Sequence, residues 1–309
     1  MEQIVQSILH SNHRRLDLMA KIDKRQYTKE QWKVIREQRR QDKELAKLAK
    51  SQPKPTVGEE TITSLSQAVA ITKSETENYV VCLKHGKKYG PEYVNTLARM
   101  VKRNLTIPYT FVCFTEDTNG IDKSIVTYPL PALSEAHGWW YKPMFFNKDL
   151  PVKGNILYMD LDVVVFRNID KLFTFNPEKF CIIRDFNRSL RSDWKKMNSS
   201  VFRYQTGTMH YLYDEFARHP KHYIHRMHGD QDYIHDQTKR DDFVWWPDEW
   251  IQSYKWDMRY RRDLIRVDGK RNFKEDKPPI IKDQTAIAVF HGEPHPHDCN
   301  DSWVTKNWV

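Results

Sequence analysis

The chain has 309 residues and a formal net charge of +9, with 39% hydrophobic and 13% aromatic residues. That much apolar material can fill a large core, which excludes an intrinsically disordered chain. No apolar run is long enough for a transmembrane helix, and residues 1–10 lack the basic start and apolar stretch of a signal peptide. None of the four cysteines forms a C-x-x-C pair, so no zinc site is indicated, and Cys82, Cys113 and Cys181 are expected as buried free thiols. These features favour the cytoplasm, which would be the host cytoplasm for a viral protein.

The positive charge is concentrated at the N-terminus. Residues 1–50 carry 13 Lys and Arg against 7 Asp and Glu, which leaves a net charge of only +3 for the other 259 residues. This segment is almost free of Gly and Pro and has apolar residues at helical spacing, so it predicts a basic helical hairpin. Residues 51–75 read as a polar linker with room for a short helix. An arm that meets a polyanion and a solvated helix that only adds solubility both fit the hairpin.

Residues 76–309 form the predicted main domain, in which strand patterns alternate with helix patterns. Helices are expected from Pro91 to Asn104 and from Trp139 to Phe146. The alternation predicts an α/β fold with a Rossmann-like, mostly parallel sheet that is flanked by helices and binds ligands at the carboxyl ends of its strands. The expected strands are Tyr79–Leu83, Tyr109–Phe114, Ser124–Tyr128, Ile156–Met159, Phe180–Ile183 and Ala286–Phe290.

Two carboxylates, Asp160 and Asp162, interrupt an apolar run of the strand type. Buried carboxylates are costly unless a positive group binds them, and the i, i+2 spacing puts both on one side of an extended chain. A divalent cation would satisfy both, while an ordinary pair of turn-forming aspartates fits the spacing equally well. Lys84–His85 and Glu116–Asp117 also follow predicted strands, so all three pairs should meet at one edge of the sheet. That convergence favours a cation site.

A histidine follows the last predicted strand in the same way. His291 comes directly after Ala286–Phe290, with Gly292 beside it to permit close approach of a ligand. Two carboxylates and an imidazole suit Mn²⁺ or Mg²⁺ better than zinc, because oxygen ligands dominate the set.

Five segments, in this order along the chain, resemble A-type (GT-A) nucleotide-sugar glycosyltransferases of family 8, the glycogenin and lipopolysaccharide-galactosyltransferase group. From residue 79 to 298 the chain also resembles small bacterial and phage-type glycosyltransferases. Ser200 stands where the family has Gly, and the last segment is shorter than the family's element. The segments are GWWYKPMF at 138–145, LYMDLDVVV at 157–165, NSSVFRYQ at 198–205, GDQDYI at 229–234 and FHGEP at 290–294.

The resemblance implies a GT-A fold and a glycosyltransferase that uses a nucleoside-diphosphate sugar, with a UDP-sugar as the expected donor and retention of configuration as the expected outcome. It implies that Asp160, Asp162 and His291 hold Mn²⁺ or Mg²⁺, and that Asp230, Gln231 and Asp232 lie at the reactive face. An inverting enzyme would need a carboxylate base, for which Asp248 and Glu249 are also available. The expected donor-binding residues are Leu83, Lys84, His85, Tyr89, Thr115, Glu116, Asp117, Lys142, Asp160, Leu161, Asn198, Lys255 and Gly292.

The acceptor is left open by the sequence. A glycan or a lipid-linked sugar is one alternative. A modified base in phage DNA is another, because the basic hairpin and the aromatic, basic stretch Trp245–Arg262 suit a polyanion. A third interpretation is a non-catalytic module that binds nucleic acid or protein and keeps the α/β domain as a sugar-nucleotide scaffold. The oligomeric state cannot be inferred.

Overall fold

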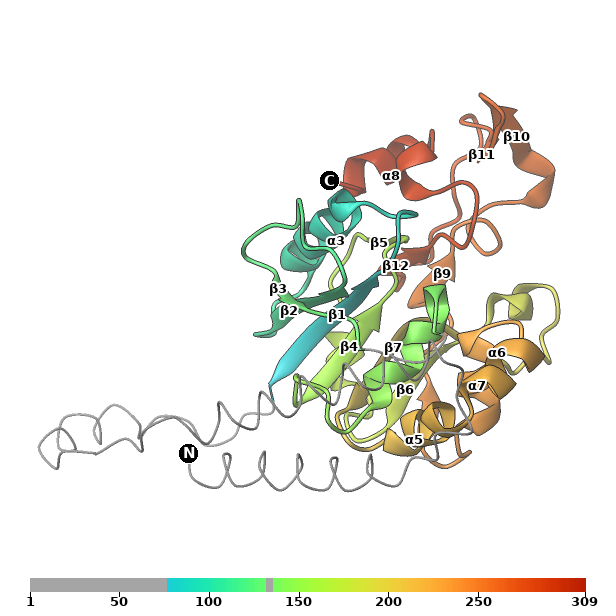
Figure 1. Ribbon diagram of the computed structural model, residues 1–309. Helices are drawn as coiled ribbons and strands as arrows, with labels where there is room; N and C mark the ends of the chain where they lie inside the picture. Colours follow the sequence, from blue (N-terminus) through green and yellow to red (C-terminus); the bar gives the residue numbers. More distant parts are fainter. Residues whose placement is uncertain (1–76, 132–135) are drawn as a thin grey trace, which may run out of the picture. The chain divides into compact units, whose positions relative to one another are not determined.

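The computed structural model describes residues 77–131 and 136–309 (Figure 1). The hairpin and linker expected in residues 1–75 lie outside this part of the chain. The described residues are built around a seven-stranded sheet with the order β3-β2-β1-β4-β7-β6-β8. Neighbouring strands are parallel except where β7 pairs with β4 and with β6. The predicted α/β class with a mostly parallel sheet is therefore confirmed.

The strands of the main sheet are β1 (Asn78–Lys84), β2 (Thr110–Thr115), β3 (Val126–Tyr128), β4 (Asn155–Met159), β6 (Phe180–Arg184), β7 (Met197–Gln205) and β8 (Phe243–Trp245). The helices are α3 (Pro91–Asn104), α4 (Lys171–Thr174), α5 (His210–Arg218), α6 (Pro220–Arg226), α7 (Asp230–Gln237) and α8 (Ser302–Asn307), with 3₁₀ segments η3 (Gly138–Phe146), η4 (Phe186–Ser189), η5 (Arg261–Asp263) and η6 (Pro296–Asp298). The short strands β10 (Leu264–Val267) and β11 (Lys270–Phe273) pair as a separate hairpin.

A second, smaller sheet adjoins the turn that follows β4 of the main sheet. Its order is β5 (Val163–Val165), β12 (Ile287–Val289) and β9 (Ile251–Ser253). The pairing puts Val163, Val289 and Ser253 side by side. Beyond that row, the amide of Phe290 donates to the carbonyl of Asp162 at 2.9 Å. The small sheet therefore ties the turn after β4 to the segments that follow β9 and β12.

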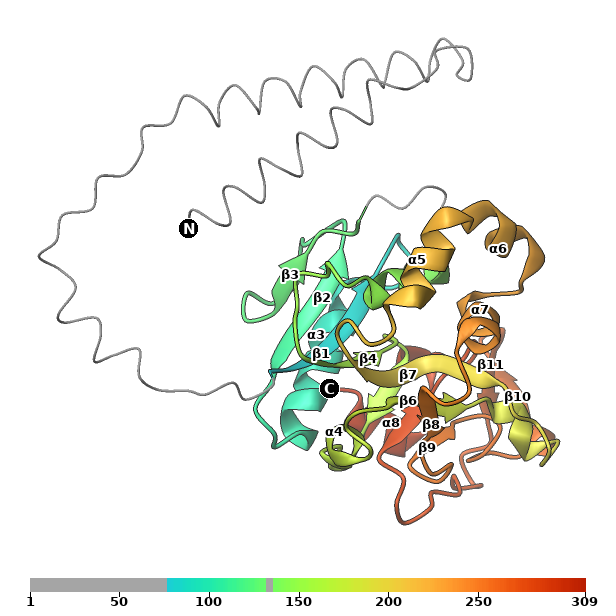
Figure 2. The same ribbon diagram turned by 90° about the horizontal axis from the view of Figure 1, so that it is seen from below.

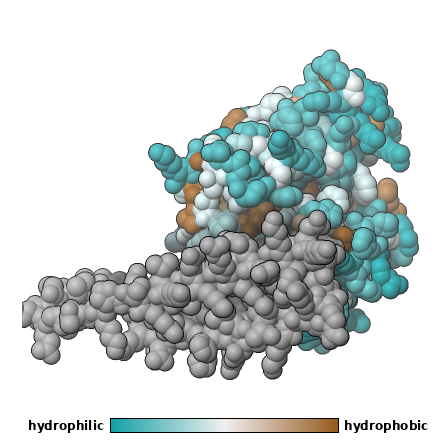
Figure 3. Space-filling model, in the orientation of Figure 1, coloured by the Kyte–Doolittle hydropathy of each residue, from teal (hydrophilic) through white to brown (hydrophobic). Residues whose placement is uncertain are grey.

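The main sheet separates two apolar cores, because alternate residues of a strand point to opposite faces. In β1, Val80 and Cys82 face the core that contains α3, whereas Val81 faces the core that contains η3, α5 and α7. Figures 1 and 2 show α3 on one side of the sheet and the group α5, α6 and α7 on the other. The visible surface in Figure 3 is mostly hydrophilic, with hydrophobic side chains only in small groups. No helix in the described ranges has the length and apolar character that crossing a bilayer requires.

The predicted elements agree with the structure to within a few residues, and all four cysteines are buried free thiols. The segment at 138–146 is helical as expected but forms a 3₁₀ helix that contains Pro143. The strand β7 was not predicted as a strand. Eight of its nine residues are buried, although the polar run Asn198–Ser200 lies near its start. Its sequence therefore shows neither the long apolar run nor the alternation that predicts a strand.

A fully buried arginine, Arg203 of β7, holds the end of α4 against the sheet. Its side chain is 0% exposed and has no carboxylate partner among the described residues. Its guanidinium instead donates to backbone carbonyls and to the sulfur of Cys181 at 2.8 Å. The carbonyls are those of Leu172, Phe175, Asn176 and Pro177.

Replacing Arg203 by Met should lower the free energy of unfolding by about 3 kcal/mol or more, because several buried carbonyls lose their donors at once. Denaturant unfolding of the two proteins measures the difference. Arg191→Met is the matched control, since the Arg191 side chain is 62% exposed and its loss should change stability by less than about 0.5 kcal/mol. Equal stability of the Arg203 variant and the wild type would contradict this role.

Candidate functional site

The described residues enclose a cleft of about 580 Å³ at the carboxyl ends of β1 and β4. This is the edge at which α/β sheets bind ligands. Its walls come from the loop after β1, from η3, from the turn after β4, from β7, from the start of α7 and from the segment after β12. Many of the residues singled out in the sequence meet here: Leu83, His85, Tyr89, Lys142, Asp160, Leu161, Asp162, Asn198, Asp230, Gln231, Asp232 and His291.

Several other expected donor-binding residues lie next to the cleft and not in its wall. Glu116 accepts a hydrogen bond from the amide of Gly86 at 2.6 Å, so it shapes the loop after β1. The ammonium of Lys255 donates to the carbonyl of His291, and a side chain on Gly292 would begin 3.3 Å from that ammonium. The remaining three are Lys84, which is buried at the end of β1, and Thr115 and Asp117, which hydrogen-bond to each other in the turn after β2.

The two aspartates lie in the turn between β4 and β5. The amide of Asp160 donates to the carbonyl of Ser200 at 2.8 Å, where the pairing of β6 with β7 is interrupted by a bulge. Such bulges redirect backbone groups next to binding sites. The carboxylate of Asp160 accepts a hydrogen bond from the Tyr158 hydroxyl at 2.9 Å, and that of Asp162 accepts one from the Tyr89 hydroxyl at 2.8 Å. Tyr89 also packs against Tyr93 of α3, with ring centroids 4.6 Å apart.

A buried ammonium, that of Lys142, joins the two sides of the cleft. Its Nζ lies 2.9 Å from Asp160 and 3.5 Å from Asp230, and it donates to the carbonyl and the hydroxyl of Ser199, each at 3.2 Å. Burial alone would lower the pKa of Lys142, but the charges of the two aspartates outweigh burial and raise this pKa. The side chain is therefore a fixed positive charge that η3 holds between the turn after β4 and the start of α7.

The negative charge of this cluster exceeds its positive charge. Three carboxylates, Asp160, Asp162 and Asp230, lie around the ammonium of Lys142, and the charge of Lys88 also acts on Asp162. Burial and the neighbouring charge of Asp160 raise the pKa of Asp162 to about 7, although the hydrogen bond from Tyr89 and the charges of the two lysines oppose the shift. Burial likewise raises the pKa of Asp230 against the effect of Lys142. When all three carboxylates are ionised the cluster has an excess of negative charge, which a proton on Asp162 or a bound cation would reduce.

The carboxylates of Asp160 and Asp162 offer oxygen ligands of the kind that Mn²⁺ and Mg²⁺ prefer. In the described ranges, however, no group of three His, Cys, Asp or Glu residues is arranged to hold a metal. His291 lies in the cleft wall with its Nε2 only 2.6 Å from the hydroxyl of Ser253.

The residues expected at the reactive face lie at the start of α7, and two of the three are held by cations. Asp230 accepts a hydrogen bond from Ser199 at 2.6 Å in addition to its contact with Lys142. Asp232 pairs with Lys196 at 3.2 Å. The carbonyl of Gln231 accepts from the Asn198 amide at 3.3 Å, and no described cation pairs with it.

Three residues of the site were not singled out in the sequence. Tyr158 was counted as part of a buried strand, and Ser199 as part of a motif in which only Asn198 was assigned. Trp139 is 55% exposed in the cleft wall and its indole lies close to Gly229. The sequence gives no signal that separates it from its neighbour Trp140, which is 3% exposed and packs into the core.

Replacing Asp162 by Asn should stabilise the metal-free protein at pH 8 by about 2 kcal/mol, after allowance for solvent screening of a partly exposed group. The ordinary pKa of this carboxyl is 3.8, and in the folded protein it is about 7. Between these values the folded chain binds a proton that the unfolded chain has lost, so wild-type stability falls as the pH rises through this window. At pH 4 the two proteins should be nearly equal in stability.

Thermal unfolding in a chelator at pH 4, 6 and 8 measures this difference. Asp193→Asn, at a side chain that is 75% exposed, is the control and should not change the pH profile. Parallel pH profiles for wild type and Asp162→Asn would show that burial and neighbouring charge do not raise the pKa of Asp162 in the folded protein.

Comparison with known proteins finds similarity to solved structures alone. The chain matches no protein-family model and no curated protein sequence. Among solved structures it is similar to the galactosyltransferase LgtC in complex with donor and acceptor sugar analogs (TM-score 0.48, 12% identity, 74% of this chain and 93% of that chain). It is also similar to the glycosyltransferase GlyE of Streptococcus pneumoniae TIGR4 (TM-score 0.46, 12% identity, 71% and 56%) and to the bifunctional glycosyltransferase WbbM (TM-score 0.47, 10% identity, 77% and 52%). At this degree of similarity, the roles of individual residues must be argued from this chain itself.

Proposed function

We propose that the chain is a glycosyltransferase that moves a sugar from a nucleoside-diphosphate sugar, with a UDP-sugar as the donor, to a hydroxyl of a glycan or of a lipid-linked sugar. The observation that carries the proposal is the uncompensated negative charge of Asp160, Asp162 and Asp230 around Lys142 in the cleft. A cluster with an excess of negative charge attracts a divalent cation, and a cation held there draws in a diphosphate. Mn²⁺ and Mg²⁺ are the cations proposed.

The walls of the cleft offer different groups to the parts of such a donor. The loop after β1 contributes Lys87 and Lys88, whose positive charges suit the nucleotide phosphates. The amides of Asn198 and Gln231 supply uncharged donors and acceptors for sugar hydroxyls, and the exposed ring of Trp139 offers an apolar face. Lys142 holds Asp160 and Asp230 in fixed positions, so these charged groups need not rearrange during the reaction. When bound to the two aspartates, a divalent cation would supply positive charge against the leaving diphosphate.

The surroundings of the carboxylates support retention of configuration. Transfer breaks the bond between the anomeric carbon and the diphosphate oxygen, forms a bond to the acceptor oxygen and releases the acceptor's proton. An inverting enzyme would use a free carboxylate to take that proton. Asp230 and Asp232 are paired with Lys142 and Lys196. Asp248, which is paired with two arginines, and Glu249 do not line the cleft. The departing diphosphate oxygen is then the base that remains at the reactive face.

The nucleic-acid alternative gains no support from the described residues. The basic segment that motivated it, residues 1–50, lies outside them. Within Trp245–Arg262, Trp246 is 2% exposed and Arg259 is 6% exposed and bonded to Asp301, so part of that stretch belongs to the core. We therefore keep a carbohydrate hydroxyl as the proposed acceptor.

A panel of nucleotide sugars, each with and without Mn²⁺, tests the donor. The matching donor with Mn²⁺ should raise the Tm by several degrees, since a ligand at 100 times its Kd adds about 2.7 kcal/mol. Asp162→Ala should remove both the shift and turnover, while Asp193→Asn should keep both. A donor that binds equally well without metal, or full activity of Asp162→Ala, would refute the metal-assisted reaction.

The configuration of the product tests the mechanism separately. With an α-linked donor, the proton NMR spectrum of the product should show an α-anomeric signal, because no free carboxylate base faces the acceptor. Gln231→Ala should slow turnover without changing the anomer formed. A β-linked product would refute retention and leave the donor assignment intact.

A further inference from the structure

The ring of His291 is held from three directions at the wall of the cleft. It stacks on Phe186, with ring centroids 5.4 Å apart and planes at 6°, and it meets the edge of Trp256 at 5.0 Å and 86°. Its Nε2 lies 2.6 Å from the hydroxyl oxygen of Ser253. This packing holds the ring in one orientation. The hydrogen bond with Ser253 then decides which ring nitrogen carries the proton.

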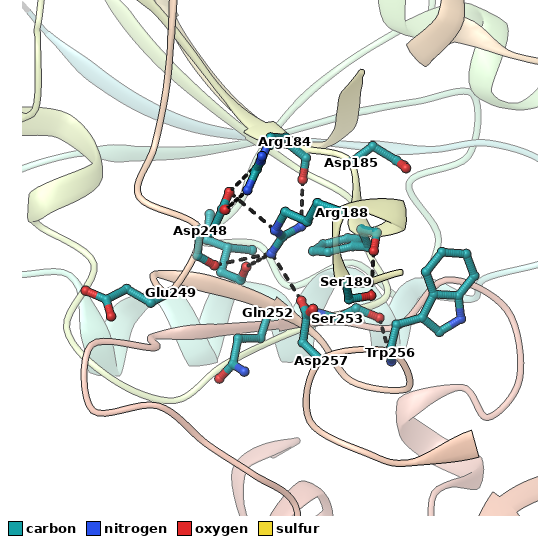
Figure 4. A network of polar contacts seen from close by, with 12 residues as sticks. Arg184, Asp185, Arg188, Ser189, Asp248, Glu249, Gln252, Ser253, Trp256 and Asp257 are labelled. Carbon is teal, nitrogen blue, oxygen red and sulfur yellow. Dashed lines mark hydrogen bonds and ion pairs between the residues drawn. The ribbon is translucent and has the colours of Figure 1, made fainter. Parts of the chain in front are cut away.

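Ser253 is itself fixed by a chain of polar contacts (Figure 4). Its amide donates to Asp257 at 2.8 Å, and the same carboxylate oxygen accepts from Arg188 at 3.1 Å. Arg188 is 9% exposed and also pairs with Asp248 at 3.3 Å. The two arginines Arg184 and Arg188 thus enclose Asp248, and the network as a whole leaves Ser253 no freedom to move.

The hydrogen bonds of Ser253 assign the proton on His291. The Ser253 oxygen already accepts from the Trp256 amide at 3.2 Å, and the residue is 0% exposed. Within the described part of the chain, the hydroxyl proton has Nε2 of His291 as its acceptor. If Nε2 carried a proton instead, the buried hydroxyl proton would have no partner, which costs about 1–3 kcal/mol. The hydroxyl therefore donates to Nε2.

The other ring nitrogen is then the one that carries the proton. Nδ1 has no hydrogen-bond partner among the described residues, and it is not one of the fully buried unpaired atoms. Because Nε2 accepts the hydroxyl proton of Ser253, the ring is neutral and its single proton is on Nδ1. A protonated nitrogen cannot bind a metal, and the unprotonated one is occupied by Ser253.

We propose that Ser253, held by Asp257 and Arg188, is a positioning residue that keeps the proton of His291 on Nδ1, so that His291 gives the cleft a hydrogen-bond donor for an oxygen of the sugar nucleotide and is not a metal ligand. The inference rests on the proposed function for the identity of that oxygen. It accounts for the absence of a three-residue metal group in the described ranges. The metal ligands of the protein are then Asp160 and Asp162.

The tautomer is tested by nitrogen NMR of the full-length protein labelled at histidine, at pH 7.5 and without ligand, with His291 identified from the spectrum of His291→Asn. The expected spectrum has a protonated Nδ1 and an unprotonated Nε2. Ser253→Ala should shift the ring toward the opposite tautomer. Ser189→Ala is the matched control, since the Ser189 hydroxyl lies in the same network but donates to the carbonyl of Phe186 at 2.8 Å. A protonated Nε2 in the wild type, or an unchanged spectrum for Ser253→Ala, would overturn the proposal.

Calorimetry separates a hydrogen-bond donor from a metal ligand. Mn²⁺ alone should bind His291→Ala as it binds the wild type, and Asp162→Asn at least tenfold more weakly. UDP with Mn²⁺ should bind His291→Ala about tenfold more weakly or worse, and His291→Asn, which keeps an N–H near the position of Nδ1, should recover most of the affinity. Equal loss of Mn²⁺ affinity in His291→Ala and Asp162→Asn would make His291 a ligand and refute the inference. If UDP binds no form of the protein, the proposed function fails, while the tautomer still decides the role of Ser253.

Discussion

The ion pairs of Lys142 are the interaction on which the candidate site depends. A buried ammonium is stable only with partners, and a buried carboxylate has the same requirement. Lys142 satisfies this requirement for Asp160 and Asp230 together, and so connects the turn after β4 to the start of α7 through η3. Without it, these segments would repel each other across the cleft. Asp162 has no ion pair of its own among the described residues, so the cleft favours added positive charge when this carboxyl is ionised.

The sequence was sufficient to predict the parts of the site that lie in contiguous motifs. Asp160 and Asp162 interrupt an apolar strand, and a charge in such a position is visible without any structure. The strands before His85, Asp160 and His291 could be predicted from their apolar runs, and their carboxyl ends do meet at one cleft. Element order and strand identity in an α/β chain follow from local apolar runs, so that part of the fold was accessible.

The remaining parts depend on contacts between residues that are distant along the chain. β7 was missed because its polar residues are buried against Lys142 and Asp230, and the sequence does not show that these partners exist. Arg203 could not be assigned to a core, since its partners are backbone carbonyls. Ser253 belongs to no motif, and its importance follows only from the distance between its hydroxyl and His291. Lys255 was selected for its charge, but its ammonium binds a backbone carbonyl beside the cleft.

The small sheet gives the two walls of the cleft unequal freedom to change during evolution. Asp162 comes directly before β5, His291 follows β12 and Ser253 is the last residue of β9. A change of register in any one of these paired strands would therefore displace the residues at the ends of the other two. The loop after β1 is another wall, and it is held by single contacts, such as those from Gly86 to Glu116 and from Tyr89 to Asp162, and not by a strand ladder. Substitutions there can alter which nucleotide fits while the charged groups stay in place. New donor specificities should therefore arise on the loop wall, and the strand wall should be inherited as a unit.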